Sequence, residues 1–236
     1  MSIATIDVSG GASTYVPPDL DKAWGPPEPP QARGANCNWW DDDCALQGTP
    51  GGSGNDGVDG IPGAQGGNGG SITFQVGVIN GAVNFTAKGG TGGRGGRGAD
   101  GGDGGKGGRG GNGHDCEYGL VGGNGGHGGR GGRGGRSGAG GNGGSIFVEC
   151  QIDNSTNSKP LDASGGTPGE HPGTGGNGGA VGAPGDAGET SGDFSASSDC
   201  PFPGVPPIWG NAGAPGGTGE AGPGGNGGSV LLRVTG

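Results

Sequence analysis

The sequence predicts a bundle of left-handed polyproline-II helices of the polyglycine-II kind, with a small β-sheet of short strands and essentially no α-helix. Three observations predict this fold class. Glycine falls on every third position through residues 89–113 and again through 123–144. The junction Gly-Gly-Asn-Gly-Gly-Ser precedes an apolar strand three times. The chain holds 73 glycines and only 26% hydrophobic residues, too few to bury a conventional core at this length.

The glycine tracts have the period of a threefold helix. A period of three matches neither the α-helix nor the β-strand, whereas polyproline II has three residues per turn and no internal hydrogen bonds. Gly-Gly-Xaa leaves two of the three ridges bare, so neighbouring backbones can approach and pair their free N–H and C=O groups. The third ridge of the first tract is expected to face water and carries Thr91, Arg94, Arg97, Asp103, Lys106 and Arg109.

Collagen and disorder are the other classes that fit this composition. Collagen requires one long Gly-Xaa-Yaa run with abundant proline, whereas these tracts are short, interrupted and often Gly-Gly-Xaa. Disorder gives no reason for strand, junction and tract to recur in one order. We therefore expect one elongated, ordered domain over residues 1–236.

The elements follow one another along the chain in a repeating order. We expect a strand at 1–9, a loop rich in Pro, Trp and Cys at 10–47, a tract at 48–70, a β-hairpin at 71–87, two tracts at 88–144, a strand and loop at 145–164, further tracts with a Cys/Pro/Trp loop at 165–228, and a strand at 229–236. The tracts at 89–113 and 122–144 have two bare ridges and are placed centrally. At about 3.1 Å per residue a tract spans about 70 Å.

The strands alternate apolar and polar residues, which is typical of a half-buried sheet. The strands that follow the three junctions begin at Ser71, Ser145 and Ser229. Asn80-Gly81 is a strong signal for a two-residue hairpin turn, so the first of them is expected to pair with the residues that follow it. About five strands then form a small sheet at one end of the bundle.

Charge and cysteine content limit which partners the protein can have and in which cellular compartment it can work. The net charge is −10, with +4 in residues 88–145 and −14 elsewhere, which opposes general nucleic-acid binding. No apolar run is long enough to insert into a membrane, and the N-terminus lacks the features of a secretory signal. Five cysteines favour an oxidising environment. We expect an extracellular or particle-associated protein despite the missing signal peptide.

Two loops rich in Pro, Trp and Cys are the candidate binding regions. Cys37 and Cys44 are placed to close a disulfide around the first loop, whereas the pairing of the other cysteines is open. The other three cysteines are Cys116, Cys150 and Cys200. The candidate binding residues of the two loops are Trp39, Trp40, Asp41, Asp42, Asp43 and Trp209.

The sequence indicates no enzyme, and we expect no catalytic residues, cofactor or metal. Residues 51–59 have the form of a calcium-binding nonapeptide, but this form occurs once and its glycines obey the tract period. The acidic residues beside Trp40 could also hold Ca²⁺, but a solvated acidic loop is the better interpretation. Residues 114–117, His-Asp-Cys-Glu, read most simply as a turn between two tracts.

Motifs such as GGRGGRGADGGDGGKGG and GGNGGHGGRGGRGG resemble those of known polyglycine-II bundle proteins. The chain is similar in this respect to springtail antifreeze proteins and to the glycine-rich receptor-binding adhesins at the tips of T-even-type phage tail fibres. The first resemblance implies ice binding by a flat face of small residues. The second implies that loops at the tip of the bundle recognise and bind a host surface protein. The inserted strands depart from the antifreeze pattern, and residues 1–47 do not match the fibre-attachment domain of the adhesins.

The leading functional hypothesis is a non-enzymatic structural protein. We expect a rigid rod that self-associates in a fibre or surface assembly, as a homo-oligomer or filament joined through unpaired strand edges. One alternative is an adhesin tip that binds a surface receptor or glycan through the Trp-rich loops. The other alternative is an ice-binding antifreeze protein.

Overall fold

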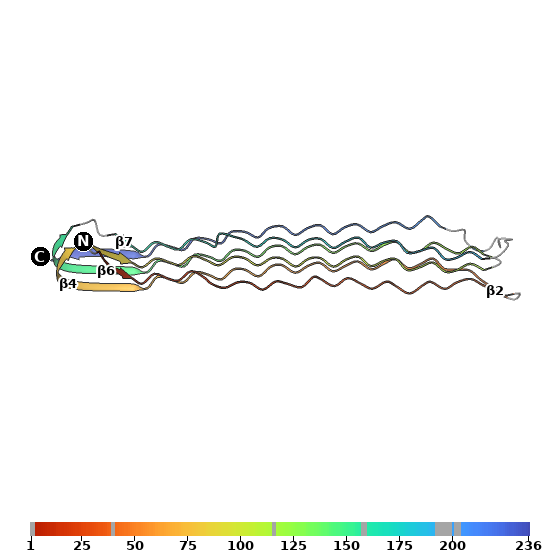
Figure 1. Ribbon diagram of the computed structural model, residues 1–236, viewed down its shortest axis with the longest axis horizontal. Coiled ribbons are helices and arrows are strands. Elements are labelled where there is room, and N and C mark those ends of the chain that lie inside the picture. The colour runs from red at the N-terminus through yellow and green to blue at the C-terminus, as the bar shows by residue number, and fades with distance from the viewer. Residues whose placement is uncertain (1–2, 39–40, 115–116, 157–159, 192–199, 201–203) are drawn as a thin grey trace.

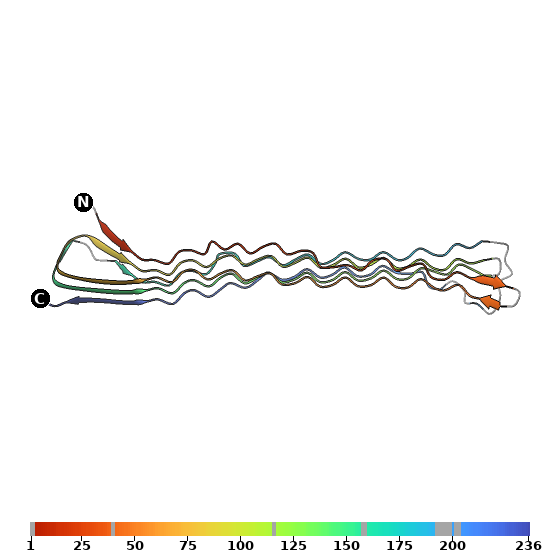
Figure 2. The ribbon, with the colours of Figure 1, turned by 90° about the horizontal axis from the view of Figure 1, so that it is seen from below.

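The structure is a computed structural model that describes residues 3–38, 41–114, 117–156, 160–191, 200 and 204–236. These residues form a long, thin rod with β-strands at both ends and wavy extended chain between them (Figure 1). None of them lies in an α-helix, as predicted, and none forms a helix with the length and apolarity needed to cross a bilayer. Both chain termini lie at the same end of the rod (Figure 2).

Two three-stranded parallel sheets form the end of the rod that carries the termini. One sheet has the order β1-β5-β7 and the other has the order β4-β6-β8. The strands of the first sheet are β1 (Ala4–Asp7), β5 (Val83–Thr86) and β7 (Leu161–Asp162), and those of the second are β4 (Ser71–Gly81), β6 (Ser145–Ser155) and β8 (Ser229–Val234). At the far end β2 (Asn36–Asn38) pairs antiparallel with β3 (Asp41–Asp43).

The predicted hairpin at residues 71–87 is wrong. The chain does turn at Gly81, which has a φ of 84°. However, β4 then pairs parallel with β6, and β5 pairs parallel with β1 and β7 in the other sheet. The predicted single sheet is therefore two parallel sheets, and the turn carries the chain from one sheet to the other.

Six extended segments connect the strands within the described part of the chain. Segments 1 (residues 8–35), 3 (87–113) and 5 (163–190) leave β1, β5 and β7 and run toward the far end. Segments 2 (44–70), 4 (119–144) and 6 (207–228) return and enter β4, β6 and β8. The residues at 10–35, which were predicted as part of a loop, instead run along the rod as segment 1 and donate backbone N–H groups to segment 3.

Backbone hydrogen bonds at every third residue join the segments. Gly123, Gly126 and Gly129 of segment 4 donate to segment 3 at distances of 2.8–2.9 Å. Gly125, Gly128 and Gly131 of the same segment donate to segment 6, also at every third position. In all, segment 3 makes backbone hydrogen bonds with segments 1, 2, 4 and 5, and segment 4 makes them with segments 2, 3, 5 and 6. The placement of these two tracts at the centre of the bundle agrees with their burial, whereas segments 2 and 6 are mostly exposed.

A conventional apolar core exists where the two sheets meet. Ile146, Val148 and Cys150 on one face of β6 are almost fully buried, together with Phe85 of β5. The Phe85 ring lies 5.2 Å from that of Phe74, measured between centroids. The alternation of these strands therefore points their apolar face inward, as the sequence predicts, and the glycine segments extend from this core.

Candidate binding surfaces

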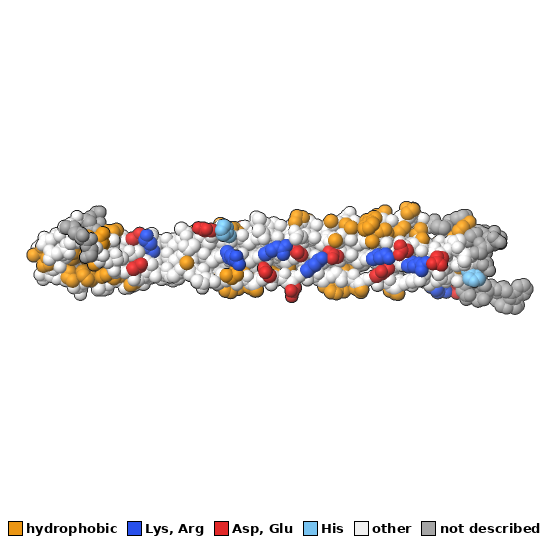
Figure 3. All heavy atoms as spheres, viewed as in Figure 1, with side chains coloured by type: hydrophobic (Ala, Val, Ile, Leu, Met, Phe, Trp, Pro, Cys, Tyr) orange, Lys and Arg blue, Asp and Glu red, His pale blue; other side chains and the backbone are white. Residues whose placement is uncertain are grey.

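A row of charged residues follows segment 3 along one face of the rod. Figure 3 shows Lys and Arg side chains alternating with Asp and Glu along this row. Lys88, Lys106 and Arg109 of segment 3 pair with acids of neighbouring chain, and Asp103 of segment 3 pairs with Lys22 of segment 1. The N···O distances are 2.7 Å for Lys88–Asp162, 2.6 Å for Lys22–Asp103, 2.8 Å for Lys106–Asp186 and 2.8 Å for Arg109–Glu189.

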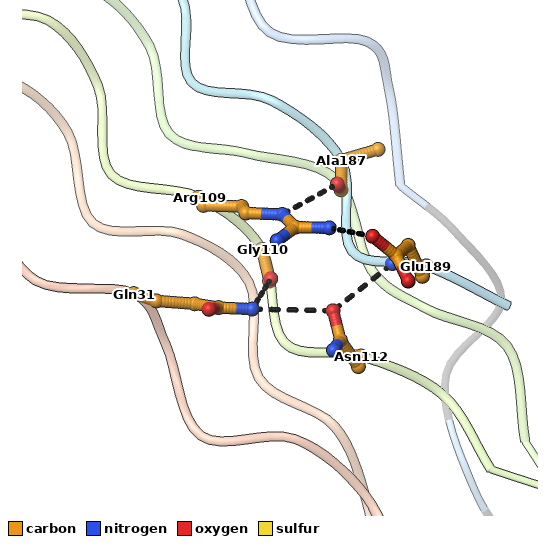
Figure 4. Close-up of polar contacts among 6 residues, drawn as sticks. All are labelled: Gln31, Arg109, Gly110, Asn112, Ala187 and Glu189. Atoms are coloured by element: carbon orange, nitrogen blue, oxygen red, sulfur yellow. Dashed lines mark hydrogen bonds and ion pairs between the residues drawn. The ribbon is translucent and has the colours of Figure 1, made fainter.

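The row ends near the far tip in a network that ties three segments together (Figure 4). Arg109 of segment 3 reaches the Glu189 carboxylate of segment 5 and donates from Nε to the Ala187 carbonyl at 3.4 Å. Gln31 of segment 1 donates from Nε2 to the Asn112 side-chain oxygen at 3.1 Å, and the Glu189 N–H donates to the same oxygen at 3.0 Å. Each of these half-exposed pairs contributes little energy by itself, and together they fix the lateral register.

The opposite end of the row makes a pH-dependent contribution to stability. A hydrogen bond from Lys88 and others from Ser164 lower the pKa of Asp162 to about 2. Because this pKa is lower than in the unfolded chain, the pair stabilises the fold above about pH 4 and this contribution is lost as the pH falls toward 2. We expect Asp162→Asn to lower the free energy of unfolding at pH 7 by less than about 1 kcal/mol, since both side chains are partly exposed.

Urea denaturation at pH 7 and at pH 2 tests this expectation. The difference between wild type and Asp162→Asn should shrink toward zero at pH 2. Asp21→Asn serves as the control, because Asp21 forms no ion pair in the described part of the chain and is exposed. An equal difference at both pH values would contradict the role assigned to the Lys88 pair.

Segment 4 carries a second row of cations on another face. Arg130 and Arg133 have no side-chain ion pair among the described residues, whereas the guanidinium of Arg136 in the same segment lies 3.9 Å from the Glu220 carboxylate of segment 6. Their backbone N–H groups donate to the carboxylates of Asp56 and Asp59, at 2.7 Å each. These two acids belong to the calcium-like nonapeptide, and here they bind backbone N–H groups.

The far tip holds a disulfide that differs from the predicted one. Cys44 bonds to Cys200, not to Cys37, and so joins the start of segment 2 to a residue that lies between segments 5 and 6 in the sequence. Glu117, which is 3% exposed, accepts the Ala45 N–H at 3.1 Å and contacts Cys200. The three side chains Cys44, Glu117 and Cys200 could together contact one metal ion, but sulfur in a disulfide is not a thiolate ligand.

The structure does not bring the remaining predicted site residues together in one place. Trp39, Trp40 and Cys116 lie outside the described residues, as do the side chains of Asp41 and Asp42. Asp43 accepts a hydrogen bond from Arg33 at 2.7 Å. Trp209 is 62% exposed beside Ile208 in segment 6, and Cys150 is a free, buried thiol in the sheet core at the other end of the rod.

Two hollows on the charged face were missed by the sequence analysis. One has a volume of about 240 Å³ and is lined by Pro17, Asp19, residues 94–97 and residues 171–174. The other, of about 470 Å³, adjoins it and is lined by residues 12–16, residues 91–94, Glu170 and His171. The sequence does contain one sign of these hollows: the spacing of the glycines changes from three residues to four between Gly169 and Gly173.

Comparison with known proteins assigns no family to this chain. No protein-family model matches it, and no curated protein matches it. Among solved structures it is similar to the nine polyproline type II helical bundle springtail antifreeze protein from Granisotoma rainieri. That match has 29% sequence identity, covers 61% of this chain and 95% of that chain, and has a TM-score of 0.10. A superposition this poor carries no argument about fold or function.

Proposed function

We propose that this chain is a non-enzymatic structural protein, a rigid rod that self-associates in a fibre or surface assembly. We infer further that its six extended segments are polyproline-II helices of the polyglycine-II kind. Donors and acceptors at every third residue support this inference, since a threefold helix presents the same ridge to the same neighbour at that interval. Lateral bonding along whole segments is suited to a stiff scaffold.

The observation that carries the proposal is the exposed edge strand β8. Every residue of this strand is exposed, and the exposed fractions are 44% for Val230, 55% for Leu231, 39% for Leu232 and 53% for Val234. The other edge strand of the sheet, β4, alternates in the usual way, with Ile72 buried and Thr73 exposed. An edge with an uncovered apolar row on one face, the exposed Leu231 on the other, and free backbone groups invites strand addition.

The inner face of β8 continues the sheet core without a cover. Val230, Leu232 and Val234 lie in register with Ile146, Val148 and Cys150 of β6, which are almost fully buried. In the other sheet the strand beyond β5 is β7, which is only two residues long. A second copy of this chain, placing its own β8 against this edge, would extend the sheet and bury both apolar rows.

Sedimentation equilibrium from micromolar to several hundred micromolar protein tests the proposal. We expect dimers or larger assemblies for the wild type. The double variant Leu231→Lys/Val234→Lys should weaken association at least about tenfold, because it places charges on both faces of the edge. Val58→Lys is the control, since Val58 is slightly more exposed than Leu231 and Val234 but lies on segment 2, away from the sheets, and this variant should associate like wild type.

Two results would overturn the proposal. One is a wild-type monomer at every concentration, and the other is equal weakening by Val58→Lys. Circular dichroism and the thermal midpoint of each variant show whether the rod remains folded. A monomer would direct attention to the second candidate, a receptor- or glycan-binding tip, which the exposed Trp209 and Ile208 in the last segment favour.

A further inference from the structure

The period of three is broken twice in the part of the rod that faces Arg94 and Arg97. Ser13 donates to the carbonyl of Thr91 and Ala23 to that of Asp100, so ten steps along segment 1 match nine along segment 3. On the other side, Gly92 donates to Thr167 and Gly95 to His171, so four steps along segment 5 match three along segment 3. Segments 1 and 5, which flank segment 3, therefore each hold one residue more than the stretch of segment 3 to which they bond.

Residues of both bulged stretches line the hollows described above, and we attribute the hollows to the two extra residues. In a threefold helix, one added residue turns the following ridge by a third of a turn unless the chain bulges locally. Beyond the bulge the register is regular again, with Gly98 bonded to Thr174 and Gly101 to Asn177. The bulges stand on either side of segment 3, and Arg94 and His171 line both hollows between them.

Arg94 is also the cation of this row that lacks an acidic partner. The described Lys and Arg residues before and after it in segment 3, Lys88, Arg97, Lys106 and Arg109, each pair with a carboxylate. The guanidinium of Arg94 has no hydrogen bond or ion pair among the described residues, although Asp19 and Glu170 line the same hollows. The Glu170 carboxylate lies 3.9 Å from the His171 ring nitrogen instead.

We propose that this double bulge is a binding site for a carbohydrate that carries a carboxylate. A free guanidinium binds a carboxylate with two parallel hydrogen bonds. The exposed ring of Tyr15 offers a face for a sugar ring, and the hydroxyls of Ser13 and Thr91 offer hydrogen bonds. The carboxylates of Asp19 and Glu170 accept sugar hydroxyls and repel long polyanions such as nucleic acid, which the net charge of −10 also disfavours.

Isothermal titration with a galactose tetrasaccharide that ends in a single galacturonic acid, in about 150 mM salt, tests the site. The neutral galactose tetrasaccharide is the comparison ligand. We expect the acidic sugar to bind at least about tenfold more tightly than the neutral one, and Arg94→Gln to remove this preference. Arg133→Gln makes the same change to an unpaired arginine of the other row that lines neither hollow, and should change the affinity less than about twofold.

A second variant tests the bulge itself. Deleting Glu170 restores the period of three in segment 5, so we expect it to close the hollow and abolish binding while the thermal midpoint stays within a few degrees of wild type. The proposal is overturned by absence of binding at millimolar sugar, by equal binding of the acidic and neutral sugars, or by equal losses in Arg94→Gln and Arg133→Gln. It is also overturned if the deletion variant remains folded and binds normally.

Discussion

Gly132→Ala is expected to destabilise the rod severely. A Cβ atom at this position would lie 1.9 Å from the carbonyl oxygen of Val58 in segment 2. Gly132 cannot move away, because its N–H donates to Ala99 of segment 3 and its carbonyl accepts from Gly176 of segment 5. Adding one methyl group must therefore push segments apart. We expect the free energy of unfolding to fall by about 3 kcal/mol or more.

Gly217→Ala is the matched control for this substitution. Gly217 lies on segment 6, and a Cβ atom there would have no neighbour within 4 Å. Removing backbone freedom from the unfolded chain should leave stability unchanged or raise it by about 0.4–1 kcal/mol. Urea denaturation followed by circular dichroism measures both variants. Equal losses in the two would mean that the close packing of segment 4 against its neighbours does not hold the rod together.

Loss of the Cys44–Cys200 disulfide is the second large effect. The bond joins residues separated by 156 positions, and its removal frees the unfolded chain from a very long loop. The chain-entropy estimate for such a loop is about 5 kcal/mol. We expect the Cys44→Ser/Cys200→Ser variant to lose about 3–5 kcal/mol of unfolding free energy in urea denaturation.

Local opening of the folded rod should increase most at the far tip, because the sheets at the other end form their own core. Hydrogen exchange followed by mass spectrometry should show faster exchange in residues 44–52 and 117–125, and little change in β4 and β6. Cys150→Ala perturbs the buried thiol of the sheet core and should give the opposite pattern. Uniform acceleration along the whole rod in the disulfide variant would show that the tip is not an independent unit.

The sequence predicts the interior of the rod well because the period of three that places a segment there can be read within the segment itself. Two bare ridges in residues 89–113 and 122–144 allow neighbours on several sides, and these tracts are the segments that the structure surrounds. The strands after Gly70, Gly144 and Gly228 are likewise predicted from their own alternation. In each case, a short run of residues contains the information.

The errors arise where pairing depends on the direction of distant segments. Asn80-Gly81 is a genuine turn, but β4 belongs to a returning segment and β5 to an outgoing one, and each sheet collects strands of one direction. The partner of Cys44 likewise follows from which turns meet at the far tip, not from spacing. Segment 1 was hidden because its prolines obscure the period of three, although the segment still bonds along segment 3.

The out-and-back path of the chain also bears on how the protein folds. The strand register joins Ser71 to Ser145 and Ser145 to Ser229, partners that are 74 and 84 residues apart. Contacts between such distant residues give a high relative contact order. Proteins of that kind fold slowly, because the entropic cost of closing long loops is met before the stabilising contacts form. Among the described residues no segment makes backbone–backbone hydrogen bonds within itself, so little holds a segment straight until its neighbours arrive. Synthesis from the N-terminus leaves segment 3 without segment 4, its central partner, until most of the chain has been made.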